Sequence, residues 1–358
     1  MKKITLITLD ITQFGGTERA IQNFVQMFYS TYEIVIYSIS SQPNDPLFFH
    51  FPKEVQIKHL NQDKIPVSAK KKIFWFPKVF GILKRNLKNS KTDFVLGMGH
   101  NVNFLLSLIN ISGTRIYGAE HIDLDTIPRV SKFLMAQTYS KLAGLVVLSE
   151  KARSKAVKLN PNIFIIPNVI HQETTDYENE AEQCANRIIM VGRISAEKGF
   201  DRVIPIAKYL QDFHPTWKID IFGDGPLKND LVSKFDLQNI TNVRFCGATK
   251  NIKSEYKKSS IFMLTSYTEA MPMVILEAQS FGLPVIAYKN EGTELLIQNF
   301  VNGILAETHE EFCKGLGLLI ENKNNIISKF KIESDEKLKE YSEKVIKSQW
   351  TLLIENQL

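Results

Sequence analysis

Cysteine is scarce in this sequence. The 358 residues include only Cys184, Cys246 and Cys313, which lie far apart and lack the paired spacing of a disulfide framework or a zinc site. This scarcity excludes a small disulfide-stabilised secreted domain and is typical of proteins in a reducing cytoplasm. We therefore expect a cytoplasmic location.

Long apolar runs are missing as well. No segment reaches the roughly 18 consecutive apolar residues that a membrane-spanning helix needs. The first apolar run, in MKKITLITLD, ends at Asp10 and is shorter than the core of a secretory signal peptide. The pattern of Ile4, Leu6 and Thr8 predicts a first buried strand instead. We expect neither a membrane span nor secretion by that route.

Acidic residues are absent from one segment. Residues 68–91 carry eight basic residues and no acid, whereas the whole chain has a net charge of +6. The remainder of the chain is therefore slightly acidic, and the positive balance belongs to one local patch.

The composition that is present indicates a soluble α/β protein. Apolar residues make up 44% and charged residues 23%, and 358 residues exceed the size of a single core. Short Val- and Ile-rich runs alternate with helical patterns, which predicts parallel sheets covered by helices. The predicted strands are residues 3–9, 33–39, 93–97, 114–119, 144–148, 163–166, 187–191, 217–222, 242–246, 260–264 and 284–288.

A polar, acidic stretch divides this pattern into two Rossmann-like halves. We predict a first domain at 1–170, a linker at 171–186 and a second domain at 187–335. The segment 332–358 is amphipathic and predicted to be helical, and its last part, 336–358, forms a separate C-terminal element.

Two glycines, Gly15 and Gly16, follow the first predicted strand and precede a helix expected to begin near Thr17. Glycine lets a ligand approach the backbone, and a helix N-terminus offers free N–H groups to an anion. The GxGxxG spacing of a dinucleotide site is not met. An anion site and a plain strand-to-helix turn remain equal alternatives.

A cationic loop opens the second half. The segment VGRISAEKGF places Arg193 and Lys198 between a strand and a helix, at the edge where open α/β sheets bind ligands. Their charges could neutralise a diphosphate without a metal, and the alternative is two solvated surface cations. The later segment FGDGP places Gly223 at the end of another strand, where a ribose or base could lie or an ordinary turn could form.

Two glutamates flank an apolar run in TEAMPMVILEA. Glu269 is predicted in a loop after a strand, and Glu277 in a buried helix that starts at Pro272. Carboxylates accept hydrogen bonds from paired hydroxyl groups, so the two residues suit a hydroxyl-rich ligand. A retaining glycosidase also uses two carboxylates, but here both lie on one strand–helix unit beside the cationic loop. The alternative for Glu277 is a paired helix glutamate.

Taken in order along nearly the whole chain, these motifs resemble the retaining glycosyltransferases of family 4. The resemblance implies the GT-B fold: two Rossmann-like domains that face a central cleft, with the C-terminal helix returning to the first domain. It also implies that Glu269 contacts the donor sugar and that Glu277 binds ribose hydroxyls. Arg193 and Lys198 would bind the donor diphosphate.

The resemblance assigns roles to other residues too. The glycine loop at 15–16 would lie by the diphosphate and the acceptor, and His121 in YGAEHID would lie beside the reacting sugar. Without the resemblance, a lone histidine after a strand is more often structural. The backbone of Met271, Pro272 and Met273 would face the sugar or the distal phosphate at a helix N-terminus.

A competing metal motif is DLD, formed by Asp123 and Asp125. It is similar to the DxD of glycosyltransferases with a different fold, in which a divalent cation binds the diphosphate. Because Arg193 and Lys198 already supply positive charge, we interpret the two aspartates as loop acids. We expect no required metal and no cofactor besides the nucleotide-sugar co-substrate.

The basic segment predicts a membrane contact at residues 70–91. Beyond Pro77 it separates into an apolar helix face and a basic face, and KKKIFWF before it places Phe74 and two further aromatic residues beside three lysines. This pattern favours anionic lipid headgroups over a merely solvated surface. No nucleic-acid motif accompanies it, so we expect no nucleic-acid partner.

The predicted activity is retaining transfer of a hexose or N-acetylhexosamine from a nucleotide sugar to a growing cell-surface glycan or a lipid-linked oligosaccharide. The resemblance favours a UDP-sugar, leaves GDP-mannose open, and places the enzyme at the inner face of the cytoplasmic membrane. The alternatives are a sugar-nucleotide epimerase, a phosphorylase, or a non-catalytic nucleotide-sugar-binding subunit. A phosphorylase would need a lysine-anchored pyridoxal phosphate and usually a longer chain.

Overall fold

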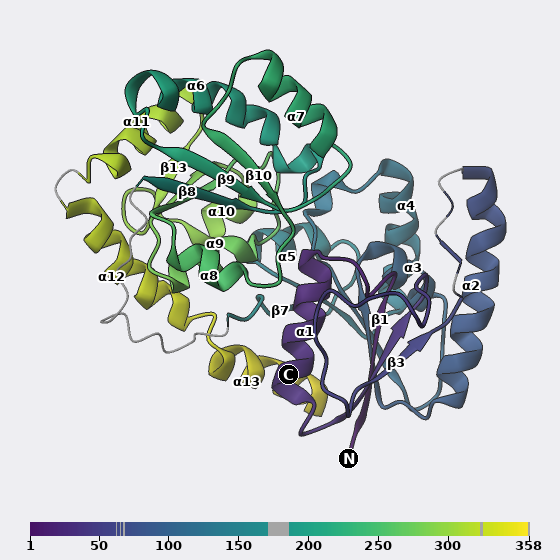
Figure 1. Cartoon of the computed structure of the whole chain (residues 1–358). Helices are drawn as coiled ribbons and strands as arrows, with labels where there is room; N and C mark the ends of the chain where they lie inside the picture. The colour runs from purple at the N-terminus through teal and green to yellow at the C-terminus, as the bar shows by residue number, and fades with distance from the viewer. Residues whose placement is uncertain (62, 65, 67–68, 171–185, 323–324, 357–358) are drawn as a thin grey trace. The chain divides into compact units, whose positions relative to one another are not determined.

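The computed structural model describes residues 1–61, 63–64, 66, 69–170, 186–322 and 325–356 (Figure 1). The chain forms two compact units. Unit 1 contains residues 1–169 and 346–358, and unit 2 contains residues 170–345. Nearly all of the predicted linker lies outside the described residues.

Unit 1 is built on a seven-stranded parallel sheet of order β3-β2-β1-β4-β5-β6-β7. The order reverses between β1 and β4, which pair directly with each other. The carboxyl ends of these two strands therefore form a topological switch point, where open α/β sheets bind ligands. The strands are β1 (Lys3–Thr8), β2 (Glu33–Ser38), β3 (Gln56–His59), β4 (Phe94–Met98), β5 (Arg115–Ala119), β6 (Gly144–Val147) and β7 (Ile163–Ile165).

Helices cover both faces of this sheet. Helices α1 (Gly16–Phe28) and α13 (Glu343–Glu355) contribute to the apolar core on one face. Helices α2 (Ala69–Asn89), α3 (His100–Ser107) and α4 (Arg129–Thr138) contribute to the core on the other. The remaining helical segments of the unit are η1 (Leu124–Thr126), η2 (Tyr139–Lys141) and α5 (Glu150–Ala156).

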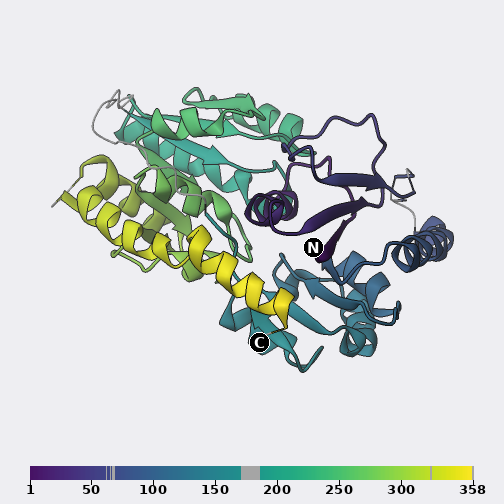
Figure 2. The ribbon, with the colours of Figure 1, turned by 90° about the horizontal axis from the view of Figure 1, so that it is seen from below.

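Helix α13 completes unit 1 from the far end of the sequence. Trp350 packs edge-on against Phe24 of α1, with ring centroids 5.1 Å apart. The Arg115 guanidinium donates to the carbonyls of Leu353 and Ile354. Figure 2 shows α13 in yellow ending within this unit.

Unit 2 repeats the same topology. Its six parallel strands have the order β10-β9-β8-β11-β12-β13, so the reversal lies between β8 and β11. The strands are β8 (Arg187–Val191), β9 (Lys218–Phe222), β10 (Val243–Gly247), β11 (Ile261–Leu264), β12 (Val285–Tyr288) and β13 (Ile304–Ala306). The helices are η3 (Ala196–Lys198), η4 (Phe200–Arg202), α6 (Val203–Phe213), α7 (Lys228–Leu237), α8 (Ile252–Lys257), α9 (Met273–Ser280), α10 (Glu291–Leu296), α11 (His309–Ile320) and α12 (Ile326–Lys339).

The predicted α/β class with two Rossmann-like sheets is confirmed, and all eleven predicted strands are present to within one residue at each end. The prediction missed β3 and β13, which are short strands at sheet edges. The single C-terminal helix predicted at 332–358 is instead two helices, α12 and α13, separated by residues 340–342.

Helix α2 differs from its prediction in two ways. Pro77 lies inside the helix rather than at its beginning, because the helix already starts at Ala69. Trp75, expected with its neighbours at a lipid interface, is buried in the unit 1 core, whereas Phe74 is 80% exposed. Among the helices described, none combines the length and the apolar character that a membrane crossing requires.

Candidate functional site

The strongest candidate site lies at the switch point of unit 2. Strands β8 and β11 pair as neighbours, so the loops that leave their carboxyl ends emerge side by side. The first loop carries Arg193 and Lys198, and the second carries Glu269. Sheet topology therefore joins two motifs that are about seventy residues apart in the sequence.

Lys198 and Glu269 form an ion pair in this loop cluster. The Lys198 ammonium lies 2.7 Å from Glu269 Oε1, and the Ser266 hydroxyl donates to the same oxygen at 2.7 Å. The Glu269 side chain is only 10% exposed and that of Lys198 is 27% exposed. A partly desolvated cation and carboxylate therefore lie in direct contact. A ligand that separates the pair could bind the ammonium through an anionic group or the carboxylate through a hydrogen-bond donor.

Backbone contacts hold the two loops together. Gly199 adopts a left-handed conformation with φ of 60°, and a Cβ there would lie 2.3 Å from the Thr265 carbonyl oxygen. The Tyr267 N–H donates to the Glu197 carbonyl, and the Thr265 hydroxyl donates to the Lys198 carbonyl. Only glycine fits this close approach, which brings Lys198 next to Glu269.

Arg202 connects the same loops through its side chain. Its guanidinium lies 3.9 Å from the ring centroid of Tyr267 and 4.2 Å from that of Tyr288. It also donates to the Thr265 carbonyl at 3.3 Å, while the Tyr267 hydroxyl donates to Asp201 at 2.7 Å. A cation stacked between two aromatic rings is a favourable arrangement that fixes their positions.

A third loop packs against the first. Gly223 has φ of 155°, and a Cβ there would lie 1.8 Å from the Gly192 carbonyl oxygen. The Ile194 N–H donates to the Asp224 carbonyl at 2.9 Å. Gly223 therefore makes a close backbone contact with a neighbouring loop. Its predicted contact with the nucleotide stays a prediction.

Arg193 and Glu277 are the other two charged residues of the predicted site. Arg193 is exposed on its loop. Glu277 lies on α9 and accepts a hydrogen bond from the Tyr256 hydroxyl at 3.2 Å. Pro272 is the N-cap of α9, as expected, and the neighbouring Met271 and Met273 are buried, so a ligand there would meet mainly their backbone.

In unit 1, Gly15 and Gly16 begin α1 at the carboxyl end of β1. Gly15 is the N-cap residue and has no side chain with which to cap the first turn. A helix N-terminus at a switch point is a suitable location for an anion. The anion itself stays a prediction.

His121 follows β5 in the same unit and is half-buried. Burial lowers its pKa to about 4, with Asn168 as the polar neighbour that opposes the shift. Neither ring nitrogen makes a hydrogen bond of normal geometry to a described residue. His121 is therefore a neutral imidazole near pH 7.

Glu120, one residue earlier, is buried in a polar cluster. Its Oε1 accepts hydrogen bonds from Asn103 and from the Tyr139 hydroxyl, both at 2.8 Å. Burial raises its pKa to about 7, although these two hydrogen bonds act in the opposite direction. The cluster joins the end of β5 to α3 and η2, and so fixes the backbone from which His121 extends.

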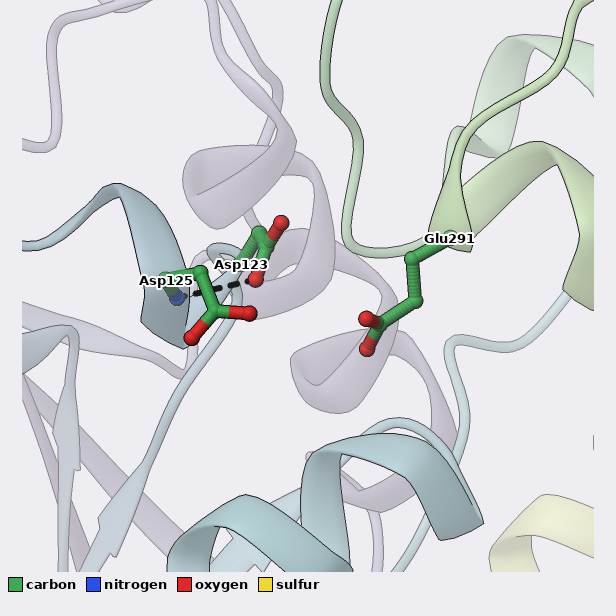
Figure 3. A group of neighbouring side chains, drawn as sticks. All are labelled: Asp123, Asp125 and Glu291. Atoms are coloured by element: carbon green, nitrogen blue, oxygen red, sulfur yellow. Dashed lines mark hydrogen bonds between the residues drawn. The ribbon is translucent and has the colours of Figure 1, made fainter.

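The two aspartates of the DLD motif also belong to unit 1. Asp123 Oδ1 accepts the Asp125 N–H at 2.9 Å, as the dashed line in Figure 3 indicates. Lys155 pairs with both carboxylates, at 3.1 Å and 2.7 Å. Glu291, the third side chain drawn in Figure 3, belongs to unit 2 and begins α10. Lys155 offsets part of the charge of the two aspartates, and their interpretation as loop acids stays a prediction.

Sequence analysis missed two contributors to the unit 2 site. Ser266 lies three residues before Glu269, and its hydroxyl donates a hydrogen bond to the Glu269 carboxylate. Arg202 lacked any motif, since its aromatic partners come from the loop after β11 and from the end of β12. Such contacts depend on sheet topology and leave no local pattern in the sequence.

Comparison with known proteins matches residues 171–345 to the family described as Glycosyl transferases group 1. An uncharacterized glycosyltransferase of Haemophilus influenzae is 30% identical over 338 residues, which cover 90% of this chain and 91% of that protein. A Campylobacter jejuni GalNAc-α-(1→4)-GalNAc-α-(1→3)-diNAcBac-PP-undecaprenol α-1,4-N-acetyl-D-galactosaminyltransferase is 24% identical over 361 residues, which cover 99% and 98% of the two chains.

Solved structures support the fold. A mutant of S. aureus TarM, in complex with fondaparinux, α-GlcNAc-glycerol and UDP, matches with a TM-score of 0.83. The match covers 99% of this chain and 100% of that chain at 15% identity. This similarity extends over both Rossmann-like units.

Proposed function

This chain belongs to the group 1 glycosyltransferases, and we propose that it transfers a hexose or N-acetylhexosamine from a UDP-sugar with retention of configuration. The proposed acceptor is a growing glycan or a lipid-linked oligosaccharide. The C. jejuni relative, whose name specifies an undecaprenol-diphosphate acceptor, supports the acceptor class. The UDP in the TarM complex supports the donor class.

The observation that carries the proposal is the contact between Lys198 and Glu269 at the switch point of unit 2, at 2.7 Å. In a nucleotide sugar, the anionic diphosphate and the hydroxyl-rich sugar are directly bonded. A ligand that offers phosphate to Lys198 and hydroxyls to Glu269 would satisfy both residues at once. Arg193, on the same loop, is placed to add a second cation to the diphosphate.

In the proposed reaction, the bond between the anomeric carbon and the diphosphate oxygen breaks, and its electron pair leaves with UDP. The acceptor hydroxyl oxygen bonds to the anomeric carbon on the same face, and its proton passes to the departing phosphate oxygen. Arg193 and Lys198 stabilise the charge that develops on the diphosphate. Glu269 orients the sugar, and the neutral imidazole of His121 accepts or donates a hydrogen bond at the acceptor side.

We also propose peripheral contact with an anionic membrane through residues 70–91. The exposed Lys78, Arg85 and Lys88 on the outer face of α2 support it. Such cations contribute about 1 kcal/mol each near an anionic surface. The sugar-nucleotide epimerase and the non-catalytic binder remain rival functions, since both would also bind a nucleotide sugar.

Replacement of Glu269 and Arg193 tests the proposal. Glu269→Ala removes the sugar contact, so we expect transfer to fall about 100-fold while affinity for UDP stays near wild type. Arg193→Ala removes a charge-assisted contact with the diphosphate, so UDP affinity should fall about tenfold or more. The measurements are calorimetric titration with UDP and transfer assays with UDP-, GDP- and ADP-sugars.

The outcomes of these assays separate the rival functions. Glycan extension supports a transferase, formation of an epimer supports the epimerase, and binding without turnover supports the non-catalytic subunit. Normal transfer by Glu269→Ala would contradict the assigned role of the ion pair. Glu269→Gln serves as the matched control for shape, because it keeps the size of the side chain and loses only the charge.

A further inference from the structure

A chain of hydrogen bonds runs through unit 1 from the edge of its sheet to the loop after β1. His59 ends the edge strand β3, and its Nδ1 lies 2.7 Å from the Ser41 hydroxyl oxygen. The Ser41 oxygen lies 2.5 Å from the hydroxyl oxygen of Ser38, the last residue of β2. The Ser38 oxygen in turn accepts the Ile11 N–H at 3.1 Å. The chain therefore joins the carboxyl ends of three neighbouring strands, β3, β2 and β1.

Three of the four residues in this chain are shielded from water. Ile11, Ser38 and Ser41 are each 0% exposed, whereas His59 is half-buried. Among the residues that the structure describes, neither serine hydroxyl has a further hydrogen-bond partner. Because a buried hydroxyl proton without an acceptor is costly, both serine protons have to be used within the chain.

The direction of every bond follows from the donors. The Ile11 N–H can only donate, so the Ser38 oxygen accepts it and the Ser38 proton goes to Ser41. The Ser41 proton then goes to His59, whose Nδ1 has to accept it. The chain therefore requires an imidazole with its proton on Nε2 and a lone pair on Nδ1. A proton on Nδ1 would reverse both serine hydroxyls and leave the Ser38 proton without an acceptor in a buried place.

The far end of the chain is the loop between β1 and α1. The Ser40 N–H donates to the Leu9 carbonyl at 2.7 Å, so the residues after β2 also hold the beginning of this loop through the backbone. The bond from Ile11 to the Ser38 hydroxyl holds the loop two residues further on. The loop ends at Gly15, the N-cap of α1, beside the switch point of unit 1.

We propose that His59 is a positioning residue for the transfer reaction. Through Ser41 and Ser38 it holds the loop after β1, and with it the N-terminus of α1, in the position that the acceptor requires. Its role needs no contact with a substrate, because small displacements of a binding loop are enough to lower the rate. The proposal rests on the proposed function only in assigning this loop to the acceptor side.

The first test reads the tautomer of His59 in the full chain. With nitrogen-15-labelled histidine, two-bond proton–nitrogen spectra near neutral pH distinguish the two ring nitrogens of each of the seven histidines. His59→Asn removes one set of signals and thereby assigns it. We expect a protonated Nε2 and an unprotonated, hydrogen-bonded Nδ1. A proton on Nδ1 would overturn the proposal.

The second test measures amide hydrogen exchange in the loop. His59→Leu removes the acceptor at the end of the chain, so exchange of the Ile11 amide should accelerate about tenfold. His59→Asn should restore slow exchange, because its carboxamide oxygen can accept the Ser41 proton in place of Nδ1. The matched control is His50→Leu, which replaces an exposed histidine of the same unit and should exchange like wild type. Wild-type exchange at Ile11 in His59→Leu would show that the chain does not hold the loop.

The third test connects the chain to the reaction. The acceptor is undecaprenyl-diphosphate-linked N-acetylgalactosamine, and the donor is the UDP-sugar that wild type turns over. His59→Leu should lower kcat/KM for this acceptor about tenfold, while the affinity for UDP stays within about twofold of wild type. His59→Asn should recover most of the rate, and His50→Leu should match wild type. Equal kcat/KM for this acceptor in His59→Leu and wild type would overturn the positioning role.

Failure of the proposed function gives a different pattern of results. If wild type turns over no nucleotide sugar, the proposed function fails and the role of His59 in transfer fails with it, while the tautomer and the exchange rates still decide whether the chain holds the loop. If wild type transfers the sugar and His59→Leu does so equally well, the proposed function stands and the proposal for His59 fails.

Discussion

At the scale of single residues, the proposed donor site depends on the ion pair between Lys198 and Glu269. Each side chain is mostly buried and each is the partner of the other, at 2.7 Å. A sugar donor would replace the ion pair with two charge-assisted contacts, one between its phosphate and Lys198 and one between its hydroxyls and Glu269. These two contacts would offset the free energy needed to separate the pair. The hydrogen bond from Ser266 would hold the carboxylate in place during this exchange.

Glu120 allows a pH prediction for a single residue. Its carboxyl has a pKa of about 7, raised by burial from an ordinary 4.5. Between these two values the unfolded chain releases a proton that the folded chain keeps. The contribution of Glu120 to the free energy of unfolding is therefore fully present below pH 4.5. Between pH 4.5 and about 7 this contribution falls by about 1.4 kcal/mol per pH unit, and above that range it is lost.

Glu120→Gln should remove this dependence, because glutamine does not ionise and its amide oxygen can still accept from Asn103 and Tyr139. We expect the free energy of unfolding of the variant to rise relative to wild type between about pH 5 and about pH 7, by about 3 kcal/mol at most. Urea unfolding at several pH values measures the difference. Parallel pH curves for the two proteins would contradict the raised pKa of this carboxyl.

At the scale of elements, the site of unit 2 is a set of loops that bind one another. Gly199, Gly223 and Gly292 each approach a carbonyl oxygen of another loop more closely than a Cβ would allow. Arg202 adds a side-chain contact between the loops after β8 and β11 and the end of β12. The loops therefore have defined positions before any ligand arrives, which reduces the ordering cost of binding.

Arg202→Leu should loosen these loops without unfolding the unit. We expect transfer to fall roughly tenfold to a hundredfold, because small displacements of catalytic groups are costly. The loss should appear in kcat/KM for the donor. Arg202→Lys keeps a cation between Tyr267 and Tyr288 and should recover part of the activity.

The control for this prediction is Lys337→Met, which removes another cation–aromatic contact of unit 2, with Tyr341. It should leave transfer unchanged. If Arg202→Leu lowers the melting temperature but leaves kcat/KM at the wild-type value, the residue only stabilises the fold.

At the scale of the whole molecule, unit 1 is discontinuous. Residues 346–358 leave unit 2 and complete the core of unit 1 with Ile346, Trp350, Leu353 and Ile354. The sequence predicted that the separate C-terminal element begins at residue 336, which falls inside α12. In the structure, the chain passes from unit 2 to unit 1 between residues 345 and 346. Unit 1 therefore needs both ends of the sequence.

Deletion of 346–358 should destabilise unit 1 selectively. Four buried apolar side chains at about 1.5–3 kcal/mol each are comparable to the whole stability of a domain. Calorimetry should show the loss of one transition and the retention of the other, and limited proteolysis should leave a fragment from unit 2. The milder Trp350→Phe should retain both transitions. Loss of both transitions on deletion would mean that the units are not independent.

The sequence alone determined the parts of this protein that depend on local pattern. Most of the predicted strands are central and buried on both faces, so they appear as apolar runs. The edge strands β7 and β10 were predicted as well, and all eleven predicted strands are confirmed. The loops after β1, β8 and β11 were recognisable because glycine, cationic and carboxylate residues follow those runs directly. The resemblance to glycosyltransferases came from the order of the same motifs, and the match to the group 1 family confirms it; assignment to family 4 stays a prediction.

Tertiary structure decided the rest. The edge strands β3 and β13 have three or four residues and acquire strand geometry by pairing with β2 and β12. Trp75 entered the core because helix packing chose the face of α2 that it shares with Val79 and Leu83. The Lys198–Glu269 contact and the position of Arg202 both depend on which elements become neighbours in space. Long-range neighbours are set by sheet order and packing, and neither leaves a pattern in the local sequence.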